Sequence, residues 1–451
     1  MKKPSSIIII PDKILSEVTQ RVTSFEDEIT SQIKGMRRIL KSHDGAGLAA
    51  NQIGVANRVI VVELEEEKNS IPFQAFVNPE IVESSAEAES MEEGCLSVPQ
   101  IELPVKRAKK IKIRFQDSEG KKRKLAAKGL LSRILQHEID HLNGILFTDR
   151  IRKQYLFAHP ELKNLKILFF GSGHFGADIL KGLILLGLKI DIITEKGKPA
   201  GRHQIVKATP VAEIAKRFGK NYLEIESFSS ERTRASITKA DLIICADFGK
   251  KIPENILKLA KISAINLHPS LLPKYRGPTP IQTAILDGAK TTGATIIEMS
   301  PEIDKGTILA QVETKTSPTD NTLTLTARLS TLGLKLLFEA LPLIAKKELK
   351  ELAQDETKAT LTHKFQKSDG EIDWKKTPKQ IERQIRAFTP WPGSYTFLPD
   401  GKRLLIHQSH LVGEGKLVLD KVQVEGGKPM KWKEFLRGYR GEKPDWFRKF
   451  K

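Results

Sequence analysis

The sequence predicts a multidomain protein in three parts: an α+β domain, an α/β domain with a parallel sheet, and a small β-barrel. The chain has 451 residues, which is long for one domain. Its hydrophobic pattern changes near residue 160, from mixed helices and short strands to regular alternation of strand and helix. From residue 363 onward the chain consists of short strand-like runs.

Residues 1–160 are assigned to the first domain because helical and strand patterns are mixed there. Helical spacing of apolar positions covers residues 26–43, and a second helix with an inward apolar stripe is predicted over 128–144. Short runs typical of strands lie at residues 57–64, 73–82 and 109–115. The isoleucine run in residues 5–15 is expected to be an edge strand that stops at Pro11.

Residues 164–350 are assigned to the second domain because strands and helices alternate. Residues 165–194 show a strand, a Gly-rich turn, a helix and a strand, which is a βαβ unit. Further strand-like runs lie at residues 240–249, 262–272 and 295–300, and a helical pattern covers 324–349. This alternation favours a doubly wound, parallel sheet. Residues 351–362 are polar and lack a pattern, so we expect a linker there, followed by a third domain over 363–451.

The composition points to a polyanionic partner, most often nucleic acid. Net charge is +19 and the isoelectric point is about 9.6. A lysine-rich proteome is the alternative explanation. The excess is densest in residues 363–451, where 20 Lys and Arg stand against 11 Asp and Glu. Two cysteines exclude a disulfide framework, and no apolar run suits a signal peptide or a membrane span. A cytoplasmic protein without a membrane partner is therefore expected.

The stretch QHEIDH carries the first candidate site. His137 and His141 are four residues apart, so on a helix both imidazoles lie on one face. H-E-x-x-H is the zinc-protease pattern, in which the glutamate, here Glu138, is a general base. A third ligand is needed, and Cys95 in EEGCLSVP is the candidate. A thiolate with two imidazoles suits Fe(II) or Zn(II), whereas a lone buried cysteine is usually only a small apolar residue.

Three motifs occur in order around these residues: GAGLAANQIG at 45–54, EGCLS at 93–97 and QHEIDHLNG at 136–144. Over roughly residues 5–150 this combination resembles the peptide deformylase family. The zinc-protease interpretation explains neither Gln52 nor Cys95. The resemblance implies an α+β deformylase-like domain that removes the N-formyl group from N-formylmethionyl peptides, nascent ones at the ribosome.

The deformylase resemblance also assigns roles to residues of this chain. Cys95, His137 and His141 would bind the metal, Fe(II) in expectation, with Zn or Ni as alternatives. Glu138 would carry a proton from water to the leaving amine. Gln52 and the backbone N–H of Leu96 would hold the oxyanion. Gly45, Gly47 and Gly94 would let the peptide backbone approach closely.

The second candidate site lies in the α/β domain. GSGHFG at 171–176 fits G-x-G-x-x-G, and Asp191 follows at the distance of a ribose contact, so these alone predict a dinucleotide-binding dehydrogenase. A later stretch overturns that prediction. INLHPSLLPKYRGPTPI places Asn266 and His268 at the carboxyl end of a strand, and Asp304 follows about forty residues later.

An Asn, a His and an Asp that converge suit acyl transfer. An attacking amine must lose a proton, and a tetrahedral oxyanion must be stabilised. Asp304 can orient the imidazole of His268 and stabilise its charged form. The alternative is that these are three unrelated polar loop residues.

The stretch around Asn266 and His268 resembles the 10-formyltetrahydrofolate-dependent formyltransferases, with a Rossmann-like domain. Ser270, Leu271, Leu272 and Pro273 look like the turn that contacts the folate. KPAGRHQIVKATPV at 198–211 resembles the tRNA-gripping loop of the methionyl-tRNA formyltransferases, with Arg202 as the tRNA contact. Residues 369–398 are similar to the start of that family's C-terminal domain, an OB-type barrel.

The resemblance covers about residues 164–410 and implies transfer of formyl from 10-formyltetrahydrofolate to initiator methionyl-tRNA. The whole chain therefore resembles a bifunctional fusion of the two families, a hydrolase followed by a transferase. Two alternatives stay open for the second half. It formylates a small-molecule amine, such as a sugar nucleotide, or it is a non-catalytic tRNA-binding module.

Overall fold

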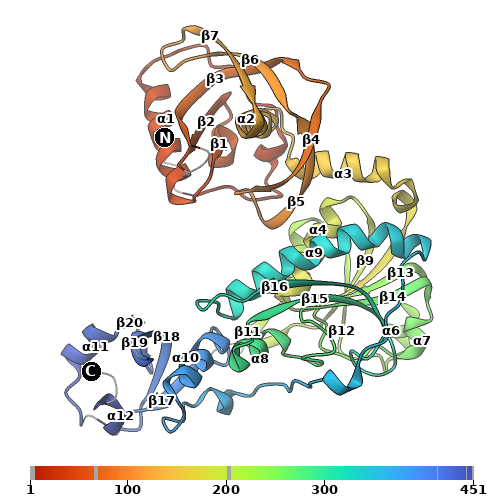
Figure 1. The fold of residues 1–451 in the computed structure, drawn as a ribbon, viewed down its shortest axis with the longest axis vertical. Coiled ribbons are helices and arrows are strands. Elements are labelled where there is room, and N and C mark those ends of the chain that lie inside the picture. Colours follow the sequence, from red (N-terminus) through yellow and green to blue (C-terminus); the bar gives the residue numbers. More distant parts are fainter. Residues whose placement is uncertain (1–5, 66–69, 201–204, 414, 443, 449–451) are drawn as a thin grey trace. The chain divides into compact units, whose positions relative to one another are not determined.

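The computed structural model describes residues 6–448 apart from 66–69, 201–204, 414 and 443 (Figure 1). The described chain divides into two compact units. The first contains Met1–Asn164 and the short segments Lys181–Lys189 and Arg217–Lys220, and the second contains the rest.

The first unit is built on a five-stranded antiparallel sheet in the order β1-β2-β3-β6-β7. Its strands are β1 (Gly47–Ala49), β2 (Val59–Leu64), β3 (Ile71–Ser84), β6 (Lys110–Gln116) and β7 (Lys122–Lys128). A separate hairpin joins β4 (Ala88–Cys95) to β5 (Val98–Ala108). The helices are α1 (Asp27–Ser42), α2 (Gly129–Leu142) and α3 (Phe147–Ala158). Figure 1 shows α2 passing through the middle of this arrangement.

Both faces of β2 are buried, each against a different helix. Side chains alternate along a strand, so Ile60 and Val62 point to one face while Val59 and Val61 point to the other. The first pair belongs to a core that includes the apolar stripe of α2. The second pair packs into a core with the apolar positions of α1. The sheet therefore holds α2, the carrier of the two histidines, against a fully packed support.

The isoleucine run at the start of the chain is not the expected edge strand. The N–H of Ile8 donates to the carbonyl of Gln52 (2.8 Å), and the N–H of Ile10 donates to the carbonyl of Ser97 (3.0 Å). These two acceptors belong to different segments, so no ladder forms. A short 3₁₀-helix, Lys13–Ser16, follows instead. The run therefore secures the backbone beside Gln52, one of the predicted site residues.

The second unit contains a seven-stranded sheet in the order β12-β9-β8-β13-β14-β15-β16. The strands are β8 (Lys166–Phe170), β9 (Lys189–Glu195), β12 (Tyr222–Ile225), β13 (Ala240–Cys245), β14 (Ala260–His268), β15 (Thr291–Glu298) and β16 (Ile308–Lys315). Five helices of this region are α4 (His174–Leu185), α5 (Pro210–Arg217), α6 (Glu231–Ala235), α7 (Glu254–Leu257) and α8 (Pro280–Asp287). A long helix, α9 (Thr322–Lys346), contacts β14, β15 and β16.

The prediction of a parallel sheet is only partly right. β12 pairs with β9, and β13 pairs with both β8 and β14, all in parallel. β15, however, runs antiparallel to β14 and to β16. The connection from β15 to β16 is too short for the crossover that parallel neighbours need, which accounts for the antiparallel pairing of those two strands. The sheet is therefore mixed, with its parallel part ending at β14. A small hairpin of β10 (Lys198–Ala200) and β11 (Ile205–Lys207) accompanies it.

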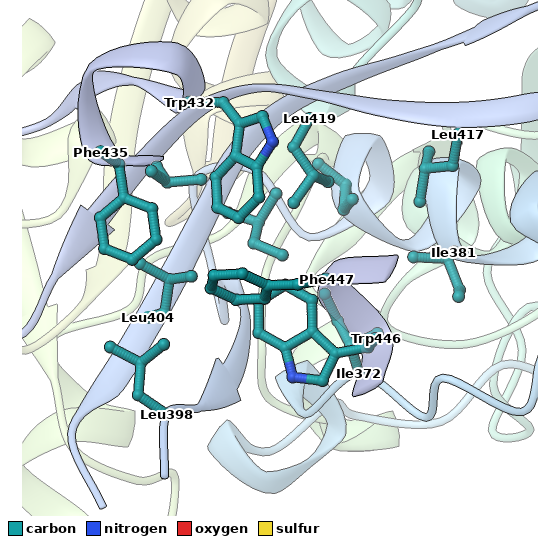
Figure 2. Close-up of a cluster of buried hydrophobic side chains, with 13 residues drawn as sticks. Ile372, Ile381, Leu398, Leu404, Leu417, Leu419, Trp432, Phe435, Trp446 and Phe447 are labelled. Atoms are coloured by element: carbon teal, nitrogen blue, oxygen red, sulfur yellow. The ribbon is translucent and has the colours of Figure 1, made fainter. Parts of the chain in front are cut away.

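The last part of the chain is a small antiparallel β domain, consistent with the expected OB type. Its sheet has the order β17-β18-β19-β20, with β17 (Ser394–Phe397), β18 (Arg403–Val412), β19 (Lys416–Val424) and β20 (Met430–Lys431). The helices are α10 (Pro378–Ala387), α11 (Trp432–Gly438) and α12 (Asp445–Arg448). Figure 2 shows how Trp432, Phe435, Trp446 and Phe447 fill its core between the sheet and the helices.

No helix in the described part of the chain has the length and apolar character of a membrane span.

Candidate active sites

Helix α2 and the end of β4 bring the three predicted metal ligands together. One ligand atom from each of Cys95, His137 and His141 lies within 4.8 Å of the other two. The Sγ atom of Cys95 is 3.2 Å from Nε2 of His141. Burial lowers the pKa of His141 well below its ordinary value, which keeps this imidazole in the neutral form that binds a metal. This donor set fits a divalent ion such as Fe(II) or Zn(II).

A buried ion-pair network supports the predicted ligand His137. Its Nδ1 atom lies 3.1 Å from Oε2 of Glu93, so Nδ1 donates there and Nε2 is left for a metal. Arg107 donates to both carboxylate oxygens of Glu93, at 2.6 and 2.8 Å, and to Asp140 at 2.7 Å. Arg133 also donates to Glu93. Although burial opposes ionisation, the hydrogen bonds from His137 and Arg107 lower the pKa of Glu93 to about 2.

No residue of this network other than His137 was predicted from the sequence. Glu93 and Asp140 lie inside the motifs EGCLS and QHEIDH, so the motifs contained a signal for both residues. Arg107 had no local signal, because it is an ordinary basic residue on a strand. Only the fold buries Arg107, which is 4% exposed, and places its guanidinium between the two carboxylates.

Glu138 lies beside the predicted metal ligands and next to the backbone of β1. The residue is 4% exposed, and burial raises its pKa to about 7. A Cβ atom on Gly47 would come within 2.5 Å of Oε1 of Glu138, so only glycine leaves room for this carboxylate. Glycine is therefore required at position 47 to leave space for Glu138, in addition to the predicted close approach of a peptide.

Gln52 directs its amide nitrogen toward the ligand cluster. Its Oε1 accepts the N–H of Ala49 (2.8 Å), which fixes the orientation of the amide group. Its Nε2 then lies 3.5 Å from Sγ of Cys95 and 3.3 Å from Oγ of Ser97. A cavity of about 450 Å³ opens here. Its lining includes the predicted residues Gly45, Gly47, Gln52, Gly94, Cys95, Leu96, His137 and Glu138, together with the apolar residues Ile101, Leu130 and Ile134.

The second site forms where β14 ends. Asn266 and His268 belong to this strand, and Asp304 lies in the loop between β15 and β16. The Nδ2 atom of Asn266 donates to Oδ1 of Asp304 (3.0 Å), and Nδ1 of His268 is 3.6 Å from Oδ2 of the same carboxylate. The structure therefore brings the three predicted residues together, and the alternative of three unrelated loop residues does not hold.

The imidazole of His268 is held from its other side by a carbonyl. Its Nε2 lies 2.9 Å from the backbone oxygen of Tyr275, so Nε2 carries the proton in the neutral ring. The unprotonated nitrogen, Nδ1, then faces Asp304. This arrangement differs from a serine-type triad, in which the carboxylate binds the ring nitrogen away from the reacting group.

The predicted folate turn is tightly fixed by its own contacts. Ser270 is fully buried, and its hydroxyl donates to the carbonyl of Lys274 (2.7 Å). The N–H of Leu272 donates to Oγ1 of Thr295 (3.2 Å). Folate contacts by Ser270, Leu271, Leu272 and Pro273 stay a prediction. Arg202, the predicted tRNA contact, lies outside the described residues.

The glycine-rich turn before α4 is occupied by the protein's own carboxylate. The backbone N–H groups of Phe175 and Gly176 donate to Asp247, and a Cβ atom on Gly173 would come within 2.0 Å of its Oδ2. These are the groups that would bind a pyrophosphate. Asp191, moreover, lies near the start of β9 and pairs with Lys166 (3.1 Å), away from the carboxyl end of the strand. The structure thus contradicts a dinucleotide site.

The folds and the two sites define a class of protein: a Cys/His/His metallohydrolase joined to a formyl transferase. Sequence comparison agrees. Residues 4–156 match the polypeptide deformylase family, 164–341 match the formyl transferase family, and 364–416 match the formyl transferase C-terminal domain. The chain belongs to the methionyl-tRNA formyltransferase family, and a polypeptide deformylase domain precedes that part. Both resemblances inferred from the motifs are confirmed.

Several individual proteins are similar to one half of the chain or the other. Methionyl-tRNA formyltransferases of Staphylococcus aureus strains MW2 and JH1 are 37% identical over 254 residues, which is 56% of this chain and 81% of theirs. A solved peptide deformylase from Synechococcus elongatus, in complex with actinonin, is 39% identical over 33% of this chain and 81% of its own, with a TM-score of 0.32. A probable peptide deformylase of Synechococcus phage S-SSM7 is 41% identical; the match covers 32% of this chain and 98% of the phage protein, with a TM-score of 0.31.

Proposed function

We propose that this chain is bifunctional. Its first domain removes the N-formyl group from N-formylmethionyl peptides, and its second half transfers formyl from 10-formyltetrahydrofolate to the amino group of initiator methionyl-tRNA. The observation that carries the proposal is the presence of two complete residue sets in one chain. Cys95, His137 and His141 converge beside Glu138, and Asn266, His268 and Asp304 converge at the end of β14.

Deformylation follows from the residues around the metal ligands. Cys95, His137 and His141 would hold a metal ion, Fe(II) in our proposal, which would act as a Lewis acid and make water a stronger nucleophile. Glu138 takes a proton from the attacking water and passes it to the leaving amine. Nε2 of Gln52 and the N–H of Leu96 donate to the oxyanion that forms at the formyl carbon. The products are formate and a free amino terminus.

The cavity beside this site suits the proposed peptide. Leu130 and Ile134 of α2, with Ile101 of β5, give one part of the lining an apolar character that fits a methionine side chain. Gly45, Gly47 and Gly94 also line the cavity, and the absence of their side chains leaves the peptide backbone room to approach. Nascent peptides at the ribosome are the proposed source of this substrate.

Formyl transfer follows from the protonation pattern of His268. Because Nε2 holds its proton against the carbonyl of Tyr275, Nδ1 takes the proton from the attacking amino group. Asp304 lies beside Nδ1 and stabilises the imidazolium. Asn266 gives one amide N–H to Asp304 and has a second for the oxyanion at the formyl carbon. The bond from the formyl carbon to the folate nitrogen then breaks, the imidazolium of His268 gives its proton to that nitrogen, and the formyl group remains as an amide on the methionyl amine.

The remaining assignments concern the substrates of the second half. The net charge of +9 over residues 363–451 supports contact with a tRNA backbone, since phosphates are bound by Lys and Arg. Arg202 is proposed to position the acceptor end. The turn from Ser270 to Pro273 is proposed to contact the folate.

Two assays on one preparation test the function. The purified protein is given methionyl-tRNA with 10-formyltetrahydrofolate, and separately a formyl-methionyl peptide. We expect formyl-methionyl-tRNA in the first and formate in the second. Cys95→Ala should remove only the second activity, and His268→Ala only the first. A protein that formylates an amino sugar nucleotide but not methionyl-tRNA would show that the second half acts on a small molecule.

A further inference from the structure

The segment after α9, expected to be a linker, is fastened to the second site. Leu352 exchanges two backbone hydrogen bonds with Ile308 at the start of β16, at 2.8 and 2.9 Å. Farther along, the N–H of Arg276 donates to the carbonyl of Thr360 (2.9 Å), and the N–H of Thr362 donates to the carbonyl of Arg276 (2.7 Å). The segment therefore runs along both loops that form the site.

Gln354 lies between these two attachments and uses all of its hydrogen-bonding capacity. Its Nε2 donates to the backbone oxygens of Asp304 (2.8 Å) and Gly306 (2.7 Å). Its Oε1 accepts from Nε and from a terminal nitrogen of Arg276, at 3.1 and 2.8 Å. An amide group offers two donors and one two-fold acceptor, so none is left over.

The two loops that Gln354 joins are the ones that hold His268. The Asp304 loop supplies the carboxylate beside Nδ1, and the Arg276 loop supplies the carbonyl of Tyr275 bound to Nε2. The N–H of Gly277 in the same loop donates to Oδ2 of Asp304 (2.8 Å). A change in the separation of these loops would change both contacts of the imidazole together.

Both loops also need an external constraint. Asp304 has a φ of 55°, and Tyr275 a φ of 64°, the left-handed region that L side chains rarely adopt. Such conformations persist only where surrounding contacts fix them. Arg276 is 2% exposed, and its charge is met by Glu356 of the same segment, at 2.7 and 2.9 Å. The segment thus supplies the partners of an otherwise buried guanidinium.

We propose that Gln354 is a positioning residue for formyl transfer. It sets the distance between the Asp304 carboxylate and the His268 imidazole by joining the Asp304 loop to Arg276. The inference rests on the proposed formyl transfer and extends it to a segment with no sequence pattern.

Two substitutions of one side chain test this in the full-length protein. Gln354→Ala removes both sides of the bridge. Gln354→Glu keeps acceptors for Arg276 but turns a carboxylate oxygen toward two carbonyl oxygens, so it breaks the bridge only at the Asp304 loop. We expect kcat for formylation to fall about 10- to 100-fold in both, since small misplacement of catalytic groups costs rates of that order. KM for methionyl-tRNA and for 10-formyltetrahydrofolate should change less than about threefold.

The neighbouring Asp355 provides a matched control. Among the residues that the structure describes, its carboxylate contacts Thr357 and Lys358 of the same segment, so Asp355→Ala should keep the parental kcat. Deformylation by every variant should stay at the parental rate.

A double-mutant cycle separates positioning from general structure. If Gln354 acts through Asp304, adding Gln354→Ala to Asp304→Asn should lower kcat by less than about threefold further. A full multiplicative loss, or a folded Gln354→Ala protein with parental kcat, would overturn the inference. Failure of the parent protein to formylate methionyl-tRNA would instead overturn the proposed function, and this inference with it.

Discussion

The Nδ1 atom of His137 lies 3.1 Å from Oε2 of Glu93, and Arg107 and Arg133 hold that carboxylate from its other sides. A partner of this kind fixes the ring orientation of a metal-binding histidine and makes its other nitrogen a better donor. The three predicted metal ligands therefore have a buried, charged network behind them.

Glu93→Gln should weaken metal binding by about 10- to 100-fold, the usual cost of losing such a partner. The side chain keeps its shape, but it no longer offers two anionic oxygens to His137 and Arg107. Metal affinity measured by competition with a chelator checks this. Glu83→Gln, on the exposed part of β3 and paired with Lys112, is the control and should bind metal like the parent. Unchanged affinity in Glu93→Gln would contradict the supporting role.

Glu138→Ala should keep the metal and lose deformylation by about 10²- to 10⁴-fold, the range expected for a general acid–base. The Glu138 carboxylate lies beside the three predicted ligands, Cys95, His137 and His141, but does not belong to that group. Metal content and formate release, measured on the same preparation, check both parts. Cys95→Ala is the contrasting variant, because it should lose metal and activity together. Loss of metal from Glu138→Ala would mean that this carboxylate is itself a ligand.

Gly47→Ala should lower deformylation strongly without unfolding the domain. The new methyl group would need the space of Oε1 of Glu138, 2.5 Å away, so the carboxylate must move. Gly35 on α1 is the matched control, because a Cβ atom there meets nothing within 4 Å. Gly35→Ala should keep its activity and stabilise the helix by about 0.5–1 kcal/mol. Rates of formate release and thermal unfolding of both variants give the comparison. Parental activity in Gly47→Ala would show that Glu138 tolerates displacement.

The sequence could predict that His137 and His141 lie together because helical spacing relates them, which is local information. Asn266 and His268 are likewise close in sequence on one strand. Glu93, Arg107 and Asp140 come together only when three separate elements pack. Their spacing in the sequence therefore does not predict the network. Gln354 was the hardest residue to predict from the sequence. It lies in a polar segment with no periodicity, and its hydrogen-bond partners are about 50 and 80 positions away.

Errors in the fold prediction have equally specific causes. Hydrophobic runs do not encode strand direction, so the antiparallel placement of β15 and β16 could not be predicted from their composition. The glycine motif at 171–176 predicted a phosphate site because its spacing is correct. The side chain of Asp247, some 70 residues later in the chain, fills that turn. A local motif contains no information about a residue so distant in the sequence.

Binding of tRNA should depend on phosphate contacts made by the basic C-terminal domain. Lys421, Lys431 and Lys433 are exposed there, on β19, β20 and α11. Each Lys–phosphate contact releases counterions. On a duplex, a plot of the logarithm of the binding constant against the logarithm of the salt concentration therefore becomes steeper by about 0.9 for each contact. Replacing the three lysines by glutamine should weaken tRNA binding and reduce that slope by up to about 3.

Three exposed lysines of the deformylase domain, Lys34, Lys122 and Lys128, provide a control of equal charge change. Replacing these three lysines by glutamine lowers the net charge of the chain by the same amount as the C-terminal replacements. It should nevertheless leave the salt dependence of tRNA binding unchanged. The measurement is tRNA affinity at several salt concentrations for the parent and both triple variants. Equal slopes in all three would remove these C-terminal lysines from the tRNA site. They would also favour a small-molecule amine as the substrate of the second half, because such a substrate needs no phosphate contacts.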